Sequence, residues 1–265
     1  MMMEPYGDTF QTAPSIDVSG MIDAAQPIAK AASTIYLRHT EPWFIGLLAH
    51  GSAVKGGFIP NCSDIDFQLY LEDGAFDAPG YIKFDIAQSI HLELAEIDPT
   101  PFRYIQCYSM TRNLRTDFVG PIPGAYHVIY GRCPVPAATA DELRQSAQDG
   151  LKQLNAYAPN LLSHGGGRLE RHVRLLCTKV WPVLYQVLVL QQDDPIATWN
   201  LPKEQAMALL PESSEMAYAI QCFYQAVLLY YPYEASVDRG LSVIESGLQF
   251  LKKVNIWSEN RLSSL

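Results

Sequence analysis

Basic residues are few in this sequence: 19 Lys and Arg stand against 28 Asp and Glu, which gives a net charge of −9 and a pI near 5.1. An acidic surface repels a phosphate backbone over most of its area, so a nucleic-acid partner is not expected. Charged residues of both signs make up only 18% of the 265 residues, whereas 48% are hydrophobic. This apolar content is enough to bury a core, which excludes wholesale disorder.

Long apolar runs are also missing. The two longest, residues 43–49 and 183–190, are much shorter than the roughly 20 residues that cross a bilayer. Residues 1–19 carry Glu4 and Asp8 and lack the basic start and apolar segment of a secretory signal. The sequence therefore predicts a globular protein of the cytoplasm with no membrane partner.

Cysteine and histidine are sparse and scattered. The five cysteines lie singly, without a CxxC pair or a Cys/His cluster, and the six histidines lack metal-ligand spacing. The pattern fits neither a disulfide framework nor a zinc site. We expect buried thiols in a reducing compartment and assign no histidine to a metal.

The chain length favours two domains in an α/β (α+β) protein. Residues 1–16 lack periodicity and are expected to form a flexible arm. Residues 17–135 are expected to form a small mixed sheet flanked by helices. The predicted elements are helices at residues 16–39 (capped by Asp17 or Ser19) and 81–97, and strands at residues 43–49, 64–71, 103–110 and 126–130.

The pattern changes after Pro134 and Pro136, which mark the expected boundary. Residues 140–265 carry helical periodicity almost throughout and are expected to form an all-helical, substrate-binding domain. The helices predicted there are residues 141–157, 168–191, 203–210, 213–229 and 236–254.

Two aspartates at alternate positions of a predicted strand are the first candidate for chemistry. Asp64 and Asp66 project from one face because side chains in a strand repeat with period two. Like charges held this close repel each other, so an inward-facing pair is costly unless Mg²⁺ or Mn²⁺ neutralises it. Without further support, such a pair is more often a solvated surface feature.

Further support comes from Gly51 and Ser52, which directly follow a predicted buried strand. A glycine turn at a strand end lets backbone N–H groups approach phosphate oxygens, and the serine adds a hydroxyl donor. Lys55, three residues later, is a candidate to neutralise phosphate charge, with simple solvation in a loop as the alternative.

The order of these features resembles the signature of the DNA polymerase β-like nucleotidyltransferase superfamily. It consists of an apolar strand, Gly51-Ser52, a loop of about a dozen residues, and Ser63-Asp64-Ile65-Asp66. The resemblance implies that Gly51, Ser52 and Ser63 hold a nucleoside triphosphate. It further implies that Asp64 and Asp66 are catalytic residues that bind the metal ions.

Within that superfamily, the chain is most similar to bacterial aminoglycoside adenylyltransferases of the streptomycin/spectinomycin type. The similarity outside the strict motif is loose and rests on Tyr130-Gly131, the helical second half, residues 175–191, Trp199 to Ala206 and Leu209 to Pro211. In that family a lysine in a Pro-Lys-x-x-Ala context reaches the nucleotide phosphates. The resemblance therefore implies this role for Lys203, whose alternative is an ordinary lysine in the first turn of a helix.

One position departs from the family pattern. The third carboxylate, the general base toward the acceptor hydroxyl, is expected on the strand at residues 103–110, where Gln106 stands instead. Glutamine cannot take a proton at neutral pH. Glu93, Glu96 or Asp98 could supply the base if the strand boundary is misplaced, and Glu93 is our choice among them. Without a base, Asp66 could deprotonate the hydroxyl.

The resemblance implies transfer of a nucleoside monophosphate, AMP from ATP, to a hydroxyl of a small acceptor with release of pyrophosphate. An acidic protein favours a cationic acceptor such as an aminoglycoside. Two alternatives remain open: a nucleotide-binding regulatory protein that has lost its chemistry, and a transferase that modifies a protein partner.

Overall fold

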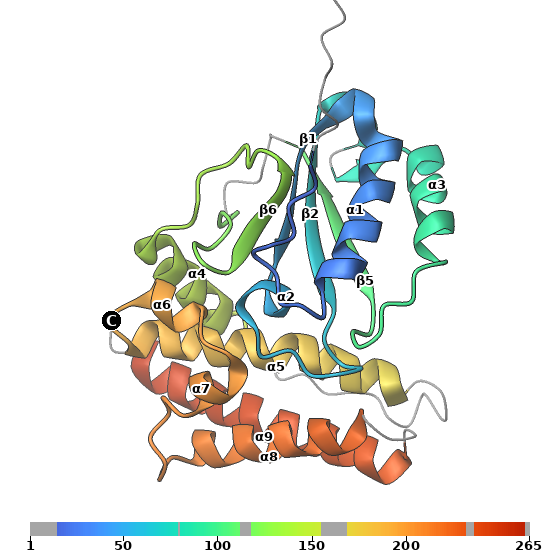
Figure 1. Cartoon of the computed structure of the whole chain (residues 1–265). Coiled ribbons are helices and arrows are strands. Elements are labelled where there is room, and N and C mark those ends of the chain that lie inside the picture. Colours follow the sequence, from blue (N-terminus) through green and yellow to red (C-terminus); the bar gives the residue numbers. More distant parts are fainter. Residues whose placement is uncertain (1–14, 79, 112–117, 155–168, 232–235, 263–265) are drawn as a thin grey trace, which may run out of the picture.

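The computed structural model describes residues 15–78, 80–111, 118–154, 169–231 and 236–262. Its centre is a four-stranded mixed sheet with the order β5-β2-β1-β6 (Figure 1). The strands are β1 (Phe44–His50), β2 (Ile65–Leu71), β5 (Ile105–Met110) and β6 (Tyr126–Gly131). β1 pairs antiparallel with β2 and β6, and β2 pairs parallel with β5. The mixed sheet is confirmed, with the predicted strands close to their expected bounds.

Helices surround this sheet and fill the second half of the chain (Figure 1). Those of the first half are α1 (Gln26–Thr40), α2 (Ser52–Lys55), α3 (Phe84–Leu94) and the 3₁₀ helices η1 (Glu41–Trp43) and η2 (Asp73–Ala75). Those of the second half are α4 (Ala140–Lys152), α5 (Leu169–Gln191), α6 (Pro195–Trp199), α7 (Lys203–Met207), α8 (Glu215–Tyr230) and α9 (Val237–Leu262). A separate ribbon pairs β3 (Phe76–Ala78) with β4 (Tyr81–Ile82).

The described residues form two large hydrophobic cores, and a smaller cluster of Ile45, Leu48 and Tyr70 is buried on one face of the sheet. Leu47, Phe67 and Leu69 point from the other face into the first core, where α1 and α3 cover them. Tyr36 of α1 packs edge-on against Phe67, with ring centroids 5.5 Å apart. The second core lies among α5, α8 and α9. Each large apolar side chain buried in this way contributes about 1.5–3 kcal/mol.

The central helix of the second core is α5. By length and composition it could cross a membrane, but 61% of its apolar window is buried inside the protein. It packs against α4 and α9. This burial is typical of the core helix of a globular protein.

The first helix begins later than predicted. α1 starts at Gln26 with Pro27 in its first turn, and residues 16–25 form turns instead. A helix starting at Asp17 would place Pro27 in its interior, where the ring removes a hydrogen bond and clashes with the preceding turn. Asp17 and Ser19 therefore cap no helix: the backbone N–H and hydroxyl of Ser19 donate to Asp17 Oδ1 at 2.9 and 2.7 Å.

Other boundaries differ where short elements interrupt the periodic pattern. The helix predicted at residues 81–97 spans only α3, because Tyr81 and Ile82 pair with β3. The short helices α2 and α6 were not predicted, and α9 continues eight residues beyond the predicted end at Val254. The flexible arm falls almost entirely on residues outside the described part of the chain.

Candidate active site

A glycine turn joins the end of β1 to α2. Gly51 has φ +75°, a conformation that side chains other than glycine rarely adopt. Its N–H donates to the carbonyl of Ala125, 3.0 Å away, and Ser52 begins α2. A Cβ added at Gly51 would lie 3.3 Å from Asp66 Oδ2. The Gly-Ser turn and the aspartate pair, predicted from separate sequence features, therefore meet in space.

Asp64 and Asp66 face into a cavity of about 400 Å³ between the end of β1, the start of β2 and α5. The side chain of Asp64 is only 11% exposed. Burial, followed by the negative charge of Asp64, raises the pKa of Asp66 to about 7. The pair is turned inward, and its mutual repulsion is the feature that a divalent cation would relieve. Within the described residues, no group of three or more His, Cys, Asp or Glu side chains is placed to hold a metal.

Arg174 of α5 was not predicted from the sequence. Its guanidinium lies 3.0 and 3.1 Å from the two carboxylate oxygens of Asp64 and 4.3 Å from the centre of the Tyr104 ring. The pKa of Asp64 is still raised, because burial outweighs the opposing charge and hydrogen bond of Arg174. This ion pair joins two residues 110 positions apart, so no local pattern could have indicated it.

Two lysines line the same cavity. Lys55 Nζ lies 3.8 Å from the centre of the Tyr185 ring and donates to the carbonyl of Trp199. Lys203 Nζ donates to the carbonyl of Gly57 at 2.8 Å. Burial lowers the pKa of both lysines, and the charge of Lys203 adds to the effect on Lys55, whose pKa falls to about 7. Two close cations in a partly desolvated wall suit a polyanion such as a triphosphate.

Of the remaining predicted residues, Ser63 also lines the cavity, but its hydroxyl accepts from the N–H of Ile59 at 2.8 Å and shapes the loop. Gln106 lies beside Asp66 in the register of β5 and β2 and donates to the hydroxyl of Tyr108. Beside Asp66, β5 therefore carries an amide in place of the carboxylate that the resemblance predicted.

Glu93 is not brought to this cavity. It lies on α3, which covers the other face of the sheet, and it contacts Arg38 and His39, the latter at 2.7 Å. The hydrogen bond from His39 and the charge of Arg38 hold the pKa of Glu93 below its ordinary value. Both its position and its pKa are unsuited to a general base acting beside Asp66. The structure therefore does not place Glu93 in the candidate site.

Cys62 and Cys177 are buried at the same cavity, as expected of thiols that pack like small hydrophobic groups. His50, the residue before Gly51, borders the cavity too and was given no role from the sequence. Its position directly before the Gly-Ser turn was the signal that could have indicated it.

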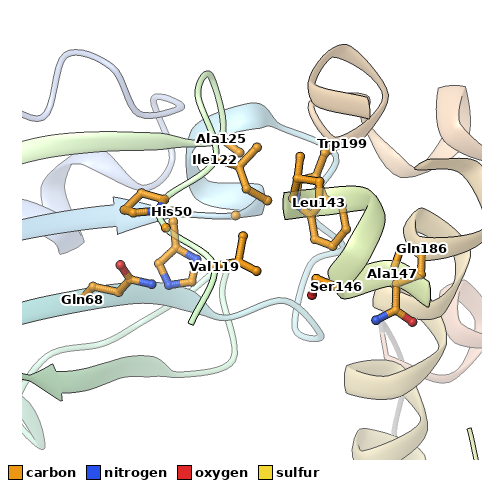
Figure 2. Close-up of a pocket in the computed structure, with 13 residues that line it drawn as sticks. His50, Gln68, Val119, Ile122, Ala125, Leu143, Ser146, Ala147, Gln186 and Trp199 are labelled. Atoms are coloured by element: carbon orange, nitrogen blue, oxygen red, sulfur yellow. The ribbon is translucent and has the colours of Figure 1, made fainter. Parts of the chain in front are cut away.

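A second cavity of about 300 Å³ adjoins the first (Figure 2). His50, Gly51 and Trp199 line both cavities. The other walls come from the segment preceding β6, from α4 and from α5. The two cavities therefore adjoin. The first is lined by charged side chains, whereas no Asp, Glu, Lys or Arg among the described residues lines the second.

The titration of Lys55 predicts a pH dependence of phosphate binding. Bound phosphates favour the charged amine of Lys55. Above pH 7 the wild type must therefore protonate Lys55 when ATP binds, whereas the arginine of Lys55→Arg is already charged. We expect the ratio of ATP affinities, Lys55→Arg over wild type, to rise by up to about tenfold per pH unit between pH 7 and 9. Calorimetric titrations measure this ratio; a constant ratio across the range would contradict the assignment.

Gly57 positions Lys203, which predicts a matched pair of variants. Gly57 has φ +71°, and a Cβ there would lie 3.0 Å from Pro202 Cα and Lys203 N; Gly56 has φ +81° but open space around its added Cβ. Both alanine variants should lose about 1–2 kcal/mol of unfolding free energy from the backbone conformation. In urea denaturation, only Gly57→Ala should lose more unfolding free energy than this. Only Gly57→Ala should also bind ATP more weakly than the wild type. Equal effects of both variants would show that the close approach of Gly57 to Pro202 and Lys203 does not matter for stability or ATP binding.

The chain, with its Gly-Ser turn after β1 and its aspartates at the start of β2, has a fold similar to that of a nucleotidyltransferase. Among solved structures, it resembles spectinomycin adenyltransferase AAD(9) from Enterococcus faecialis, crystallised with ATP and spectinomycin. The alignment has a TM-score of 0.53, covers 85% of this chain and 98% of the other, and has 16% sequence identity. No protein-family model and no curated protein sequence matches the chain. The likeness therefore establishes the fold.

Proposed function

We propose that the protein transfers a nucleoside monophosphate, AMP from ATP, to a hydroxyl of a small acceptor and releases pyrophosphate. The observation that carries the proposal is the convergence of the Gly51-Ser52 turn and the Asp66 carboxylate on one cavity that also contains Lys55 and Lys203. Similarity of fold to an adenyltransferase crystallised with ATP supports it.

Different residues of the chain would bind the phosphates, neutralise the leaving group and accept the proton. Backbone N–H groups in the first turn of α2 and the hydroxyl of Ser52 bind terminal phosphate oxygens, and Lys55 and Lys203 neutralise the pyrophosphate as it leaves. The acceptor oxygen bonds to the α-phosphorus, the bond from that phosphorus to the bridging oxygen breaks, and the hydroxyl proton is released. Asp66, beside Gln106, is the carboxylate that can accept this proton.

The aspartate pair fits Mg²⁺ or Mn²⁺ in its donor type and charge. Both are hard cations that prefer carboxylate oxygens, and the pKa of Asp66 is raised by burial and then by the charge of Asp64, both of which a bound cation would offset. Asp64 and Asp66 would hold the ion, with Arg174 giving up or sharing its contact to Asp64. When bound, the ion would neutralise developing charge on the phosphate oxygens.

The test combines Mg²⁺, ATP and a panel of aminoglycosides that includes spectinomycin, with pyrophosphate release and the mass of each acceptor measured. A nucleotide added to one acceptor, with stoichiometric pyrophosphate, supports the proposal and identifies the substrate. Absence of ATP binding would overturn it.

Gln106 favours a second candidate, a nucleotide-binding regulatory protein without transfer activity. Binding of ATP with no acceptor modified, across small molecules and proteins, is the result expected from that candidate. Labelling of a protein instead would indicate that the acceptor is a protein side chain.

A further inference from the structure

A further pocket adjoins the charged cavity, the first of the two cavities described above. Its volume is about 410 Å³, which suits a small-molecule ligand, and it is lined by Tyr104, Glu170, Arg171, Arg174, Leu175 and Thr178. We call it the arginine pocket. Arg174 and Thr178 of α5 line both this pocket and the charged cavity, whereas no described residue lines both the pocket and the second cavity. A ligand in the charged cavity can therefore extend into the arginine pocket.

The arginine pocket lies on the side of the charged cavity that is nearest β5. In the sheet order, β2 with its aspartates stands between β5 and β1, which leads into the Gly51-Ser52 turn. Tyr104, directly before β5, lines the pocket, and Gln106 and Tyr108 of β5 line the charged cavity. In an in-line transfer the acceptor oxygen and the leaving pyrophosphate lie on opposite sides of the α-phosphorus. With the triphosphate at the Gly51-Ser52 turn, the β5 side remains for the acceptor.

Guanidinium groups dominate the charge of this pocket. Arg171 and Arg174 line it. Glu170, the only carboxylate among its described lining residues, pairs with Arg103. No carboxylate in the described part of the chain pairs with Arg171, and the positive charges of Arg103 and Arg174 oppose each other. Positive charge is therefore in excess at the pocket, and a bound anion would offset it.

Arg174 is positioned to contact such an anion. Its guanidinium lies 4.3 Å from the centre of the Tyr104 ring and donates to both carboxylate oxygens of Asp64. Under the proposed function Asp64 would also hold the metal ion, so less of its negative charge would remain to offset Arg174. A guanidinium presents paired N–H donors that match two oxygens of a carboxylate or a phosphate.

We infer that the acceptor carries an anionic group, a carboxylate or a phosphate, which binds Arg171 and Arg174 in the arginine pocket while its hydroxyl lies beside Asp66. This inference rests on the proposed function and adds to it the charge class of the acceptor. It differs from the cationic acceptor that the acidic composition favours. Net charge describes the whole surface, whereas the charges nearest the acceptor are those of these arginines.

Two sets of hydroxyl compounds with matched skeletons test this inference. The first set is glucose, glucosamine, glucuronate and glucose phosphate, and the second is glycerol, aminopropanediol, glycerate and glycerol phosphate. Within each set only the charged group changes, and the two anionic members distinguish a carboxylate from a phosphate. Calorimetry would measure the affinity of each compound for the protein loaded with Mg²⁺ and a nonhydrolysable ATP.

The test variant is Arg171→Glu, and the matched control is Arg132→Glu. Both arginines are exposed, and both changes alter the net charge of the protein equally. Arg132 directly follows β6 and lines neither of the two cavities nor the arginine pocket. The comparison therefore separates the local charge of the pocket from the charge of the whole protein.

We expect an anionic member of at least one set to bind about tenfold or more tightly than the neutral member, and the amine to bind more weakly than the neutral member. Arg171→Glu should lower this preference for the anion by about tenfold and leave the affinity for Mg²⁺-ATP within about twofold. Arg132→Glu should keep the preference of the wild type.

Preferential binding of the neutral or cationic members, or no binding of any member, would overturn the inference. An unchanged preference in Arg171→Glu, or a loss of ATP affinity as large as its loss of anion affinity, would overturn it too. Transfer of a nucleotide to an aminoglycoside in preference to every anionic probe would also overturn it, while leaving the proposed function intact. If the wild type does not bind ATP, the proposed function fails, and this inference with it.

Discussion

Replacing Asp66 with Asn is expected to lower the rate of pyrophosphate release by about 10³-fold without unfolding the protein. A carboxylate that holds the metal contributes several kcal/mol to the transition state, and each 1.36 kcal/mol corresponds to a tenfold change in rate. Asp64→Asn should lose activity on a similar scale. The measurement is pyrophosphate release at saturating Mg²⁺-ATP, with circular dichroism to verify the fold.

Stability should change in the opposite direction to activity. The pKa of Asp66 rises on folding from an ordinary 3.8 to about 7, so the folded state binds more protons than the unfolded state between these values. The unfolding free energy of the wild type therefore declines as pH rises through this window. Asp66→Asn removes that decline, and its stability relative to wild type should be greater at pH 8 than at pH 5.

The control is Asp77→Asn, at an exposed position of β3 that lines neither cavity. It should keep both the wild-type rate and the wild-type pH profile of stability. Full activity in Asp64→Asn and Asp66→Asn would reject the site.

The second large effect is a gain of activity in Gln106→Glu. Gln106 neighbours Asp66 on β5 and lines the charged cavity, so a carboxylate there would lie where the acceptor hydroxyl loses its proton. General bases contribute about 10²–10⁴-fold to a rate, and we expect an increase of at least about tenfold because Asp66 already serves in the wild type. ATP affinity should change little.

Gln68→Glu is the matched control. It makes the same Gln-to-Glu change, but on β2, two residues after Asp66 and on the same face of that strand as Asp66. A position effect predicts a faster rate only in Gln106→Glu. If both variants gain activity, added charge rather than position is responsible; if neither does, Gln106 does not stand at the acceptor hydroxyl.

The sequence predicted the elements that local periodicity specifies. Alternation from Asp64 to Leu71 gave β2 with its inward acids, and the apolar run before His50 gave β1. The start of α1 was missed because the helical pattern outweighed Pro27, whose ring sets the true beginning.

Contacts between distant segments could not be predicted in the same way. Arg174 reaches Asp64 across 110 positions, and Lys203 reaches Gly57 across 146. The first depends on how α5 lies against the start of β2 and the second on how α7 lies against the loop before β2, and no spacing in the chain specifies either. The same holds for Glu93: a carboxylate at a plausible distance in sequence lies on the far side of the sheet.

The most direct measurement is a crystal structure with Mn²⁺ and a nonhydrolysable ATP, using the anomalous signal of manganese to locate the ion. An anomalous peak between the carboxylates of Asp64 and Asp66, with phosphate density against the amides that follow β1, is the result we predict. Manganese bound elsewhere, or a nucleotide bound away from the Gly51-Ser52 turn, would contradict the account.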